Sequence, residues 1–223
     1  MSSSPPTRRS RSASPASPTS RARWAARRSP GGAGIGLGDI LFGRKRLKEA
    51  SGEKVFALAT AQVTLETELG LRSAGSAAVC FKPLSAGDFK RVETELAELV
   101  DSAAESSGST VRRVSDDYGF QWIVTEDPDF EDLVTAVHLI GSELQARGFG
   151  PQLLAAIFKF EGEGHPVYWI YGYKRGAFWP FIPTGKEQER DNAEELELKA
   201  KLERELPIEP DLARWFGMFD APL

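Results

Sequence analysis

The pattern of apolar and polar residues predicts a sheet of several short strands. β-branched and aromatic residues gather in runs that Gly, Pro or Asp bound, which is typical of strands ended by turns. These runs are 77–82, 111–114, 120–124, 153–160 and the two arms of a hairpin within 167–183. The hairpin turns at Arg175-Gly176. Its second arm contains Pro180 and Pro183, which lack an amide donor, so we predict that this arm is an edge strand.

Apolar residues three or four positions apart predict the helices. The predicted starts are near Thr60, Ser85, Asp127 and Asn192. Asp127 is the expected N-cap of the third helix, because Pro128 follows it. Asn192 and Glu195 are expected to form a capping box, and Glu195 and Glu197 to pair with Lys199 and Lys201, one turn further on. A last short segment, 212–216, is expected to hold the C-terminus against the core.

The order of these elements predicts the fold class. It has no repeated βαβ rhythm, which favours an α+β fold over a parallel sheet. We expect a single domain with a largely antiparallel sheet of about 5–6 strands and about 4–5 helices, packed mainly on one face. The turn at 190–192 and the helix after it are the expected cover for the edge strand.

Residues 1–38 are expected to be a disordered tail. They contain seven Arg, no Lys and no acid, and little that could be buried. An organelle transit peptide, a plain disordered tail and translation from an upstream start codon all fit this composition. Removing these seven Arg from the 28 basic residues leaves 21 against 32 acidic residues, a formal charge of −11 for residues 39–223. This acidic balance argues against nucleic acid as a partner.

Residues 39–52 are predicted to be a basic amphipathic linker that precedes the domain at 53–223. One side is apolar, and cations follow it closely. The segment could lie on an anionic membrane surface, or it could be a solvated linker. The candidate membrane-surface residues are Leu37, Ile40, Leu41, Phe42, Arg44, Lys45, Arg46 and Lys48. The sequence has no apolar run near the roughly 20 residues that span a bilayer.

The residues that commonly carry catalysis are scarce. The chain has two histidines, His138 and His165, and a single cysteine, Cys80, which we expect to be a buried structural thiol in a reducing compartment. The common zinc, redox and serine-hydrolase motifs do not occur. We therefore expect no enzymatic activity, no metal and no cofactor.

The hairpin tip is the best candidate for a binding surface. Two adjacent cations beside aromatic residues suit an acidic protein partner, a helix or a lipid headgroup. The alternative is an ordinary hairpin whose aromatic rings pack inward while the cations face water. The candidate partner-binding residues are Tyr171, Tyr173, Lys174, Arg175, Arg190, Asp191 and Asn192.

Several segments of this chain match the pattern of a known family. They are 56–58, 61–66, 78–81, 117–122, 148–154, 173–176, 190–193 and 209–216, with Leu41-Phe42-Gly43-Arg44 near the start. Together they resemble the PspA-associated PspAB family over about residues 38–223. The Ser- and Arg-rich tail departs from that family, which favours an added tail or an upstream start.

The resemblance implies a cytoplasmic accessory protein of the phage-shock type of envelope stress response. It implies a PspA-type coiled-coil protein as partner, in places the pathway of an HtpX-like membrane protease, and no catalytic residues to carry over. Three hypotheses follow. The protein is a non-enzymatic adaptor, a peripheral protein at the inner face of the cell membrane that uses residues 37–48, or an enzyme of unrecognised class. An enzyme would need a pocket lined by His138 or by paired acids.

Overall fold

The computed structural model describes residues 52–82, 98, 101–102, 104, 108–186 and 188–223. The expected tail, the candidate membrane-surface residues at 37–48 and nearly all of the helix predicted from Ser85 lie outside these ranges.

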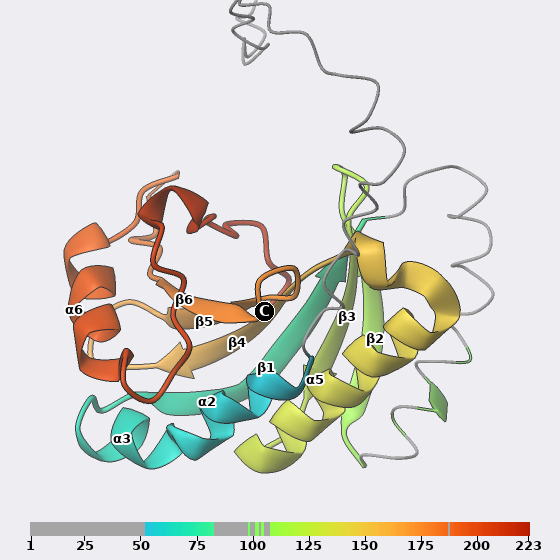
Figure 1. Ribbon diagram of the computed structural model, residues 1–223, viewed down its shortest axis with the longest axis horizontal. Helices are drawn as coiled ribbons and strands as arrows, with labels where there is room; N and C mark the ends of the chain where they lie inside the picture. Colours follow the sequence, from blue (N-terminus) through green and yellow to red (C-terminus); the bar gives the residue numbers. More distant parts are fainter. Residues whose placement is uncertain (1–51, 83–97, 99–100, 103, 105–107, 187) are drawn as a thin grey trace, which may run out of the picture. The chain divides into compact units, whose positions relative to one another are not determined.

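Six strands form one antiparallel sheet in the described part of the chain (Figure 1). They are β1 (Arg72–Phe81), β2 (Thr110–Ser115), β3 (Gln121–Glu126), β4 (Leu153–Glu161), β5 (Val167–Gly172) and β6 (Ala177–Phe181). The strand order is β2-β3-β1-β4-β5-β6. This confirms the predicted α+β class, and it confirms that the second hairpin arm, β6, is an edge strand.

The helices accompany the sheet mainly on one face. The longer ones are α5 (Phe130–Leu144) and α6 (Asn192–Leu202). The shorter ones are α2 (Ala57–Thr60), α3 (Gln62–Thr67) and the single turns Gly52–Phe56, Gln145–Phe149, Gly150–Gln152 and Leu212–Arg214. The first helical segment begins before the predicted Thr60, because Val55 and Leu58 already place apolar side chains on the buried side. No helix among the described residues is long and apolar enough to cross a membrane.

The N-caps of both long helices differ from the prediction by a residue or two. The N-cap of α5 is Asp129, whose carboxylate accepts hydrogen bonds from the backbone N–H groups of Glu131 and Asp132. Asp127 instead accepts from Ser109 Oγ at 2.6 Å and from the N–H of Asp129 at 2.8 Å. Asp127 therefore shapes the chain before the helix, and Asp129 satisfies the free amides of its first turn.

At the start of α6, Asp191 takes the place predicted for Asn192. Its side chain accepts from the N–H groups of Ala193 and Glu194, both at 3.0 Å. The predicted Glu195–Lys199 pair does not form, because Glu195 turns inward to Arg190, while the predicted pair between Lys201 and Glu197 forms at 2.6 Å.

The sheet has a large core on one face and a smaller one on the other. The larger core holds α2, α3, α5 and the apolar side of α6, with Leu133, Phe158 and Trp169 fully buried. The smaller core lies against the last residues of the chain. Its buried members are Ala78, Cys80, Trp122, Val124, Ala155, Ile157, Ile170, Trp179, Phe181 and Trp215. We call residues 209–223 the C-terminal strap.

Two segments cover the open edge of β6. Phe178 donates its N–H to Pro207 O at 2.8 Å and accepts from the N–H of Glu209 at 2.9 Å. Nearer the end of the strand, Asp191 N–H donates to Ile182 O at 2.8 Å. The turn expected to cover this edge therefore protects only its end, and residues 207–209 pair with its start at Phe178.

Candidate functional site

A cavity of about 670 Å³ lies on the smaller-core side of the sheet. Its walls come from the β2–β3 turn (116–120), the β5–β6 turn (173–176) and the strap. We call it the turn cavity. Its volume falls within the range of pockets that hold small molecules, about 300–1,000 Å³. It is lined by Asp116, Tyr118, Phe120, Trp122, Leu154, Ala155, Gly172, Lys174, Arg175, Trp179, Arg214, Phe216, Gly217, Met218, Phe219, Asp220 and Ala221.

The floor of the turn cavity is hollow because small residues lie side by side in the sheet. Cys80 of β1 pairs with Ala155 of β4, and Ala155 pairs with Gly172 of β5. Neighbouring strands are about 4.8 Å apart, so these three positions span roughly 10 Å with little side-chain volume. Trp122, the partner of Cys80 in β3, stands at one end of this row. Trp179 lies against Gly172 at the other end, where an added Cβ would come within 2.8 Å of its ring.

The strap forms one wall because it is attached near both edges of the sheet. Trp179 of the edge strand β6 donates its indole N–H to Phe216 O at 3.0 Å. Arg112 of the opposite edge strand, β2, donates from Nη2 to Pro222 O at 3.1 Å. The strap therefore crosses the sheet between these two points, and residues 217–221 lie between the attachments.

Asp116 fixes the aromatic wall beside the β2–β3 turn. Its carboxylate accepts from the N–H groups of Tyr118 and Phe120 and from the indole N–H of Trp122, each at 2.9 Å. An Asp that closes a turn in this way is common. The third bond also sets the orientation of the Trp122 ring, which the sequence did not reveal.

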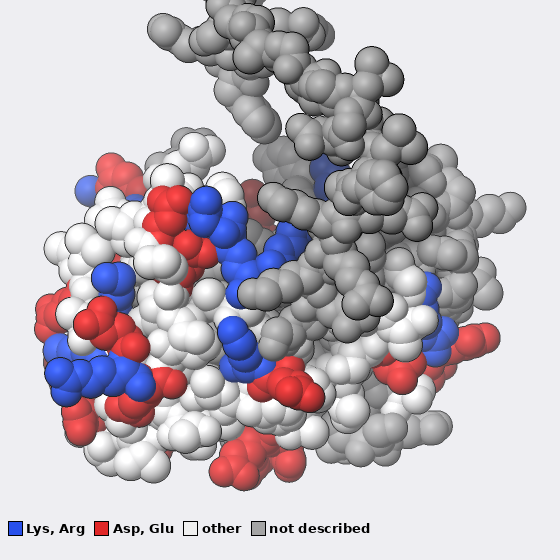
Figure 2. Space-filling view, in the orientation of Figure 1, with Lys and Arg blue, Asp and Glu red and all other residues white. Residues whose placement is uncertain are grey.

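Three cations line the turn cavity, and a buried carboxylate holds two of them. Glu209, whose side chain is 4% exposed, lies 3.4 Å from Arg175 Nε and 3.6 Å from Arg214 Nη1. Arg214 also pairs with Asp211 at 3.0 Å. Lys174 is exposed, and no ion pair within the described ranges engages it. On the face in Figure 2, basic and acidic side chains of the coloured residues are interspersed.

The structure separates the four hairpin residues predicted to bind a partner. Tyr171 and Tyr173 are buried in the larger core, with ring centroids 5.5 Å apart. Burial raises the pKa of Tyr171 to about 12, and burial together with the nearby Tyr171 also raises the pKa of Tyr173. Lys174 and Arg175 are exposed and line the turn cavity. This is the inward-aromatic, outward-cation arrangement of the alternative interpretation.

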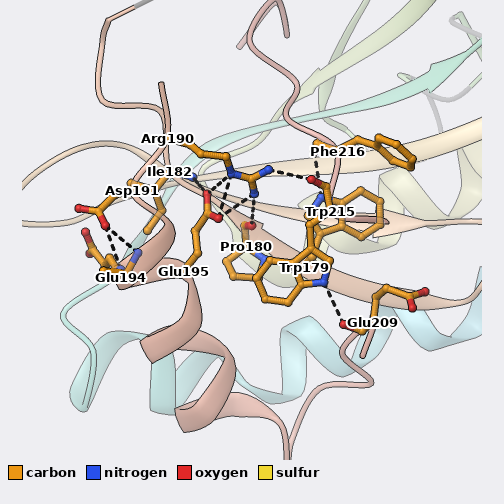
Figure 3. A network of polar contacts seen from close by, with 11 residues as sticks. Trp179, Pro180, Ile182, Arg190, Asp191, Glu194, Glu195, Glu209, Trp215 and Phe216 are labelled. Atoms are coloured by element: carbon orange, nitrogen blue, oxygen red, sulfur yellow. Dashed lines mark hydrogen bonds and ion pairs between the residues drawn. The ribbon is translucent and has the colours of Figure 1, made fainter. Parts of the chain in front are cut away.

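Arg190 and Glu195 form a structural junction (Figure 3), and neither residue lines the turn cavity. Arg190 Nε donates to both carboxylate oxygens of Glu195, at 2.8 and 2.9 Å, and Nη1 donates to Trp215 O at 2.7 Å. Glu195 also accepts from the N–H of Ile182 at 2.9 Å. Burial raises the pKa of Glu195, although the Arg190 guanidinium and the Ile182 N–H oppose this shift. Asn192, the last predicted partner-binding residue, is exposed at the start of α6.

Neither of the two histidines nor Cys80 is among the residues that line the turn cavity. His138 is half-buried, with Nδ1 3.3 Å from Gly52 O and its ring 4.8 Å from that of Phe56. Cys80 is fully buried, as predicted, and burial followed by the charge of Asp116 raises its pKa. Within the described ranges, no group of three or more His, Cys, Asp or Glu side chains could hold a metal ion.

Sequence reasoning found two of the three cations that line the turn cavity, Lys174 and Arg175, and missed Arg214 and most of the interior. Trp122, Ala155 and the strap residues 216–221 were not candidates. The available signal was small residues at positions 80, 155 and 172, each within or beside an apolar run. That signal becomes visible only when the strand register aligns the three positions.

The structure thus defines an α+β domain with a cavity that has an aromatic interior and a cationic edge. The chain belongs to the PspAB family, because the family model described as PspA associated protein B matches residues 35–223. This confirms the resemblance drawn from the sequence, and the description associates the chain with PspA. Searches among curated proteins and among solved structures gave no match.

Proposed function

We propose that this protein is a non-enzymatic adaptor of the phage-shock type of envelope stress response. It acts in the cytoplasm and binds a PspA-type coiled-coil protein through the β5–β6 turn. The family description, PspA associated protein B, supports the choice of partner. The observation that carries the choice of surface is the exposed pair Lys174 and Arg175 at the tip of an otherwise buried hairpin.

The geometry of this turn suits an acidic helix surface. Burial of Tyr171 and Tyr173 fixes the base of the turn, so its two cations project from a rigid element. Coiled coils carry charged residues beside their apolar seam, and complementary charges across an interface favour association and set orientation. A rigid cationic turn can therefore bind an acidic stripe with little loss of side-chain and backbone entropy.

The other two hypotheses stay predictions. The candidate membrane-surface residues lie outside the described ranges, so the structure does not test that hypothesis. For an enzyme, the carboxylates at the turn cavity are Asp116 and Asp220. Asp116 already accepts three hydrogen bonds within its own hairpin, which suits a structural role better than proton transfer.

Co-purification with PspA from cells tests the proposal. The test variant combines Lys174→Glu with Arg175→Gln. Gln is chosen at 175 because a carboxylate there would lie beside buried Glu209. The matched control, Lys186→Glu with Arg204→Gln, makes the same charge change at exposed positions that do not line the turn cavity.

We expect the test variant to lose PspA while the control retains it, with both variants remaining folded. Equal recovery of PspA with the test variant and the unmodified protein would reject the turn as the binding surface.

A further inference from the structure

We propose that the turn cavity binds a small amphipathic anion, with an apolar body and one carboxylate or phosphate group. This inference goes beyond the adaptor function and does not depend on it. It rests on the shape, lining and charge of the cavity.

The interior of the turn cavity suits an apolar body. Trp122 and Trp179 stand at the two ends of the row of small residues, and Phe120, Met218 and Phe219 add to the lining. Burying apolar ligand surface against such side chains favours binding. Pockets that are mostly apolar with a few charged groups are the usual form of small-molecule sites.

The edge of the turn cavity favours an anionic head group. Its charged lining residues are three cations, Lys174, Arg175 and Arg214, and two acids, Asp116 and Asp220. The carboxylate oxygens of Asp116 already accept hydrogen bonds from two backbone N–H groups and the Trp122 indole. The cations are therefore the charged groups better placed to interact with a ligand.

Glu209 sets the position of the two arginines without exhausting their donors. It meets each guanidinium through one contact, to Arg175 Nε and to Arg214 Nη1. Each guanidinium carries five N–H donors, so both keep donors for a carboxylate or phosphate. The buried carboxylate thus prepares a cationic edge from two segments that are far apart in the sequence.

A small ligand fits this site better than a protein segment does. The sheet forms the floor, and two turns and the strap form walls, so the lining comes from several directions around a limited volume. A peptide helix needs a long open groove, in which anchors from successive turns can be placed.

Titration calorimetry on the full-length protein tests the inference with a matched set of probes. Dodecanoate and dodecyl phosphate carry the proposed head groups, and dodecyltrimethylammonium carries the same chain with the opposite charge. Tryptophan fluorescence reports on the site independently, because Trp122 and Trp179 line it. We expect saturable binding of one molecule of either anion and at least about tenfold weaker binding of the cation, a difference of about 1.4 kcal/mol.

Two variants locate the bound probe. Ala155→Leu adds volume to the floor, whereas its control, Ala213→Leu, adds the same atoms at an exposed position that does not line the cavity. The variant with Lys174→Glu and Arg175→Gln alters the cationic edge of the turn cavity. Its control is again Lys186→Glu with Arg204→Gln. We expect each test variant to weaken dodecanoate binding about tenfold or more, and each control to leave it unchanged.

The outcomes separate this inference from the adaptor function. Ala155→Leu is expected to lose dodecanoate while still recovering PspA, because its side chain is inside the cavity. The inference is overturned if neither anion binds saturably, if the cation binds as well as the anions, or if folded Ala155→Leu binds dodecanoate normally. If Ala155→Leu does not fold, two other results test the inference. They are the preference for the anionic probes over the cationic one and the dodecanoate affinity of the variant with Lys174→Glu and Arg175→Gln.

A final arm distinguishes a free ligand from a membrane. The protein is sedimented with phosphatidylglycerol vesicles, with and without excess dodecanoate. Pelleting with vesicles by a protein that does not bind dodecanoate would overturn the inference and indicate a membrane-surface contact instead.

Discussion

Arg190 links three parts of the chain through its guanidinium group. It binds Glu195 of α6, Trp215 O of the strap and, at 3.4 Å, Pro180 O of β6. Its side chain is 17% exposed and that of Glu195 is 2% exposed, so water can replace little of this network. A buried, hydrogen-bonded pair of this kind is costly to break, because the remaining charge loses its partner.

We predict that Arg190→Ala lowers the free energy of unfolding by about 3–5 kcal/mol at neutral pH. Urea unfolding followed by circular dichroism measures this loss. Arg175→Ala is the comparison, because Arg175 is 47% exposed and its contact with Glu209 is longer. It should cost much less, since partly exposed ion pairs contribute about 0–1 kcal/mol. Equal losses for the two variants would show that the Arg190 network does not stabilise the fold.

The pH dependence of Arg190→Ala follows from Glu195. The pKa of Glu195 is raised in the folded protein, so the folded state holds this proton to higher pH than the unfolded state does. The stability that this raised pKa contributes is fully present below the pKa of Glu195 in the unfolded state. It is lost as the pH rises through the pKa of Glu195 in the folded state. Removing the guanidinium raises that pKa further. We predict that the destabilisation is smaller near pH 5 than near pH 7.5, and a loss independent of pH would contradict this mechanism.

Gly141 is required by the close approach of Tyr173. A Cβ at position 141 of α5 would lie 2.5 Å from the Tyr173 hydroxyl and 3.0 Å from its ring. Among the described residues, that hydroxyl has no hydrogen-bond partner. In a helix, Ala is normally more stabilising than Gly by about 1 kcal/mol. At position 141 we expect the opposite, because the added Cβ would collide with Tyr173.

We predict that Gly141→Ala destabilises the protein by about 1–3 kcal/mol. Tyr173→Phe alone should cost little, because it removes a buried hydroxyl that lacks a partner in the described structure. In the double variant the closest contact is gone, so Gly141→Ala should cost less than it does alone. A thermal double-mutant cycle measures this coupling, and strict additivity would contradict it.

At the scale of elements, the strands and helices could be predicted from the sequence, but the residues that cap the helices could not. The run 153–160 became β4 with one residue added, and 120–124 became β3 with small shifts at both ends. Local side-chain periodicity is enough for such elements. The N-caps differed because Asp127 and Asn192 are as suitable as Asp129 and Asp191 by composition, and only chain geometry chooses between them.

The strap is an element with little regular structure that nevertheless packs like one. Trp215 is buried, and its indole N–H donates to Glu209 O at 2.9 Å. The sequence predicted that 212–216 holds the C-terminus to the core, and the burial of Trp215 confirms this. The path of the strap across the sheet was not predictable, because it depends on contacts with Arg112 and Trp179, which are remote in sequence.

We predict that Trp215→Ala lowers the free energy of unfolding by about 3–5 kcal/mol, because it leaves a cavity and an unpaired carbonyl at Glu209. Chemical unfolding followed by circular dichroism measures the loss. The neighbouring Phe216 is 64% exposed, so Phe216→Ala should change stability by no more than about 0.5 kcal/mol. If the two substitutions were equally costly, the strap would not be anchored through Trp215.

At the scale of the whole molecule, the helices and the turn cavity lie on opposite faces of the sheet. The larger core uses α2, α3, α5 and α6, and of the residues that the structure describes, mainly the strap and two turns cover the other face. The sequence indicated helices mainly on one face. It could not indicate a cavity on the other, because that cavity depends on the register that aligns Cys80, Ala155 and Gly172.

The cations at positions 174 and 175 connect the two proposals. They are the exposed tip of the hairpin, and they also line the edge of the turn cavity. If both proposals hold, a bound anion and an acidic partner compete for the same charges. Dodecanoate should then weaken PspA binding, and Ala155→Leu should remove that effect of dodecanoate.

The central claim is that the β5–β6 turn binds PspA, and the affinity of the two purified proteins tests it most directly. Biolayer interferometry at low and at physiological salt compares the unmodified protein with the variant carrying Lys174→Glu and Arg175→Gln. We predict at least about tenfold weaker binding for the variant, and a smaller difference at higher salt because exposed charges are screened. Equal affinity of the two proteins at both salt concentrations would contradict the claim.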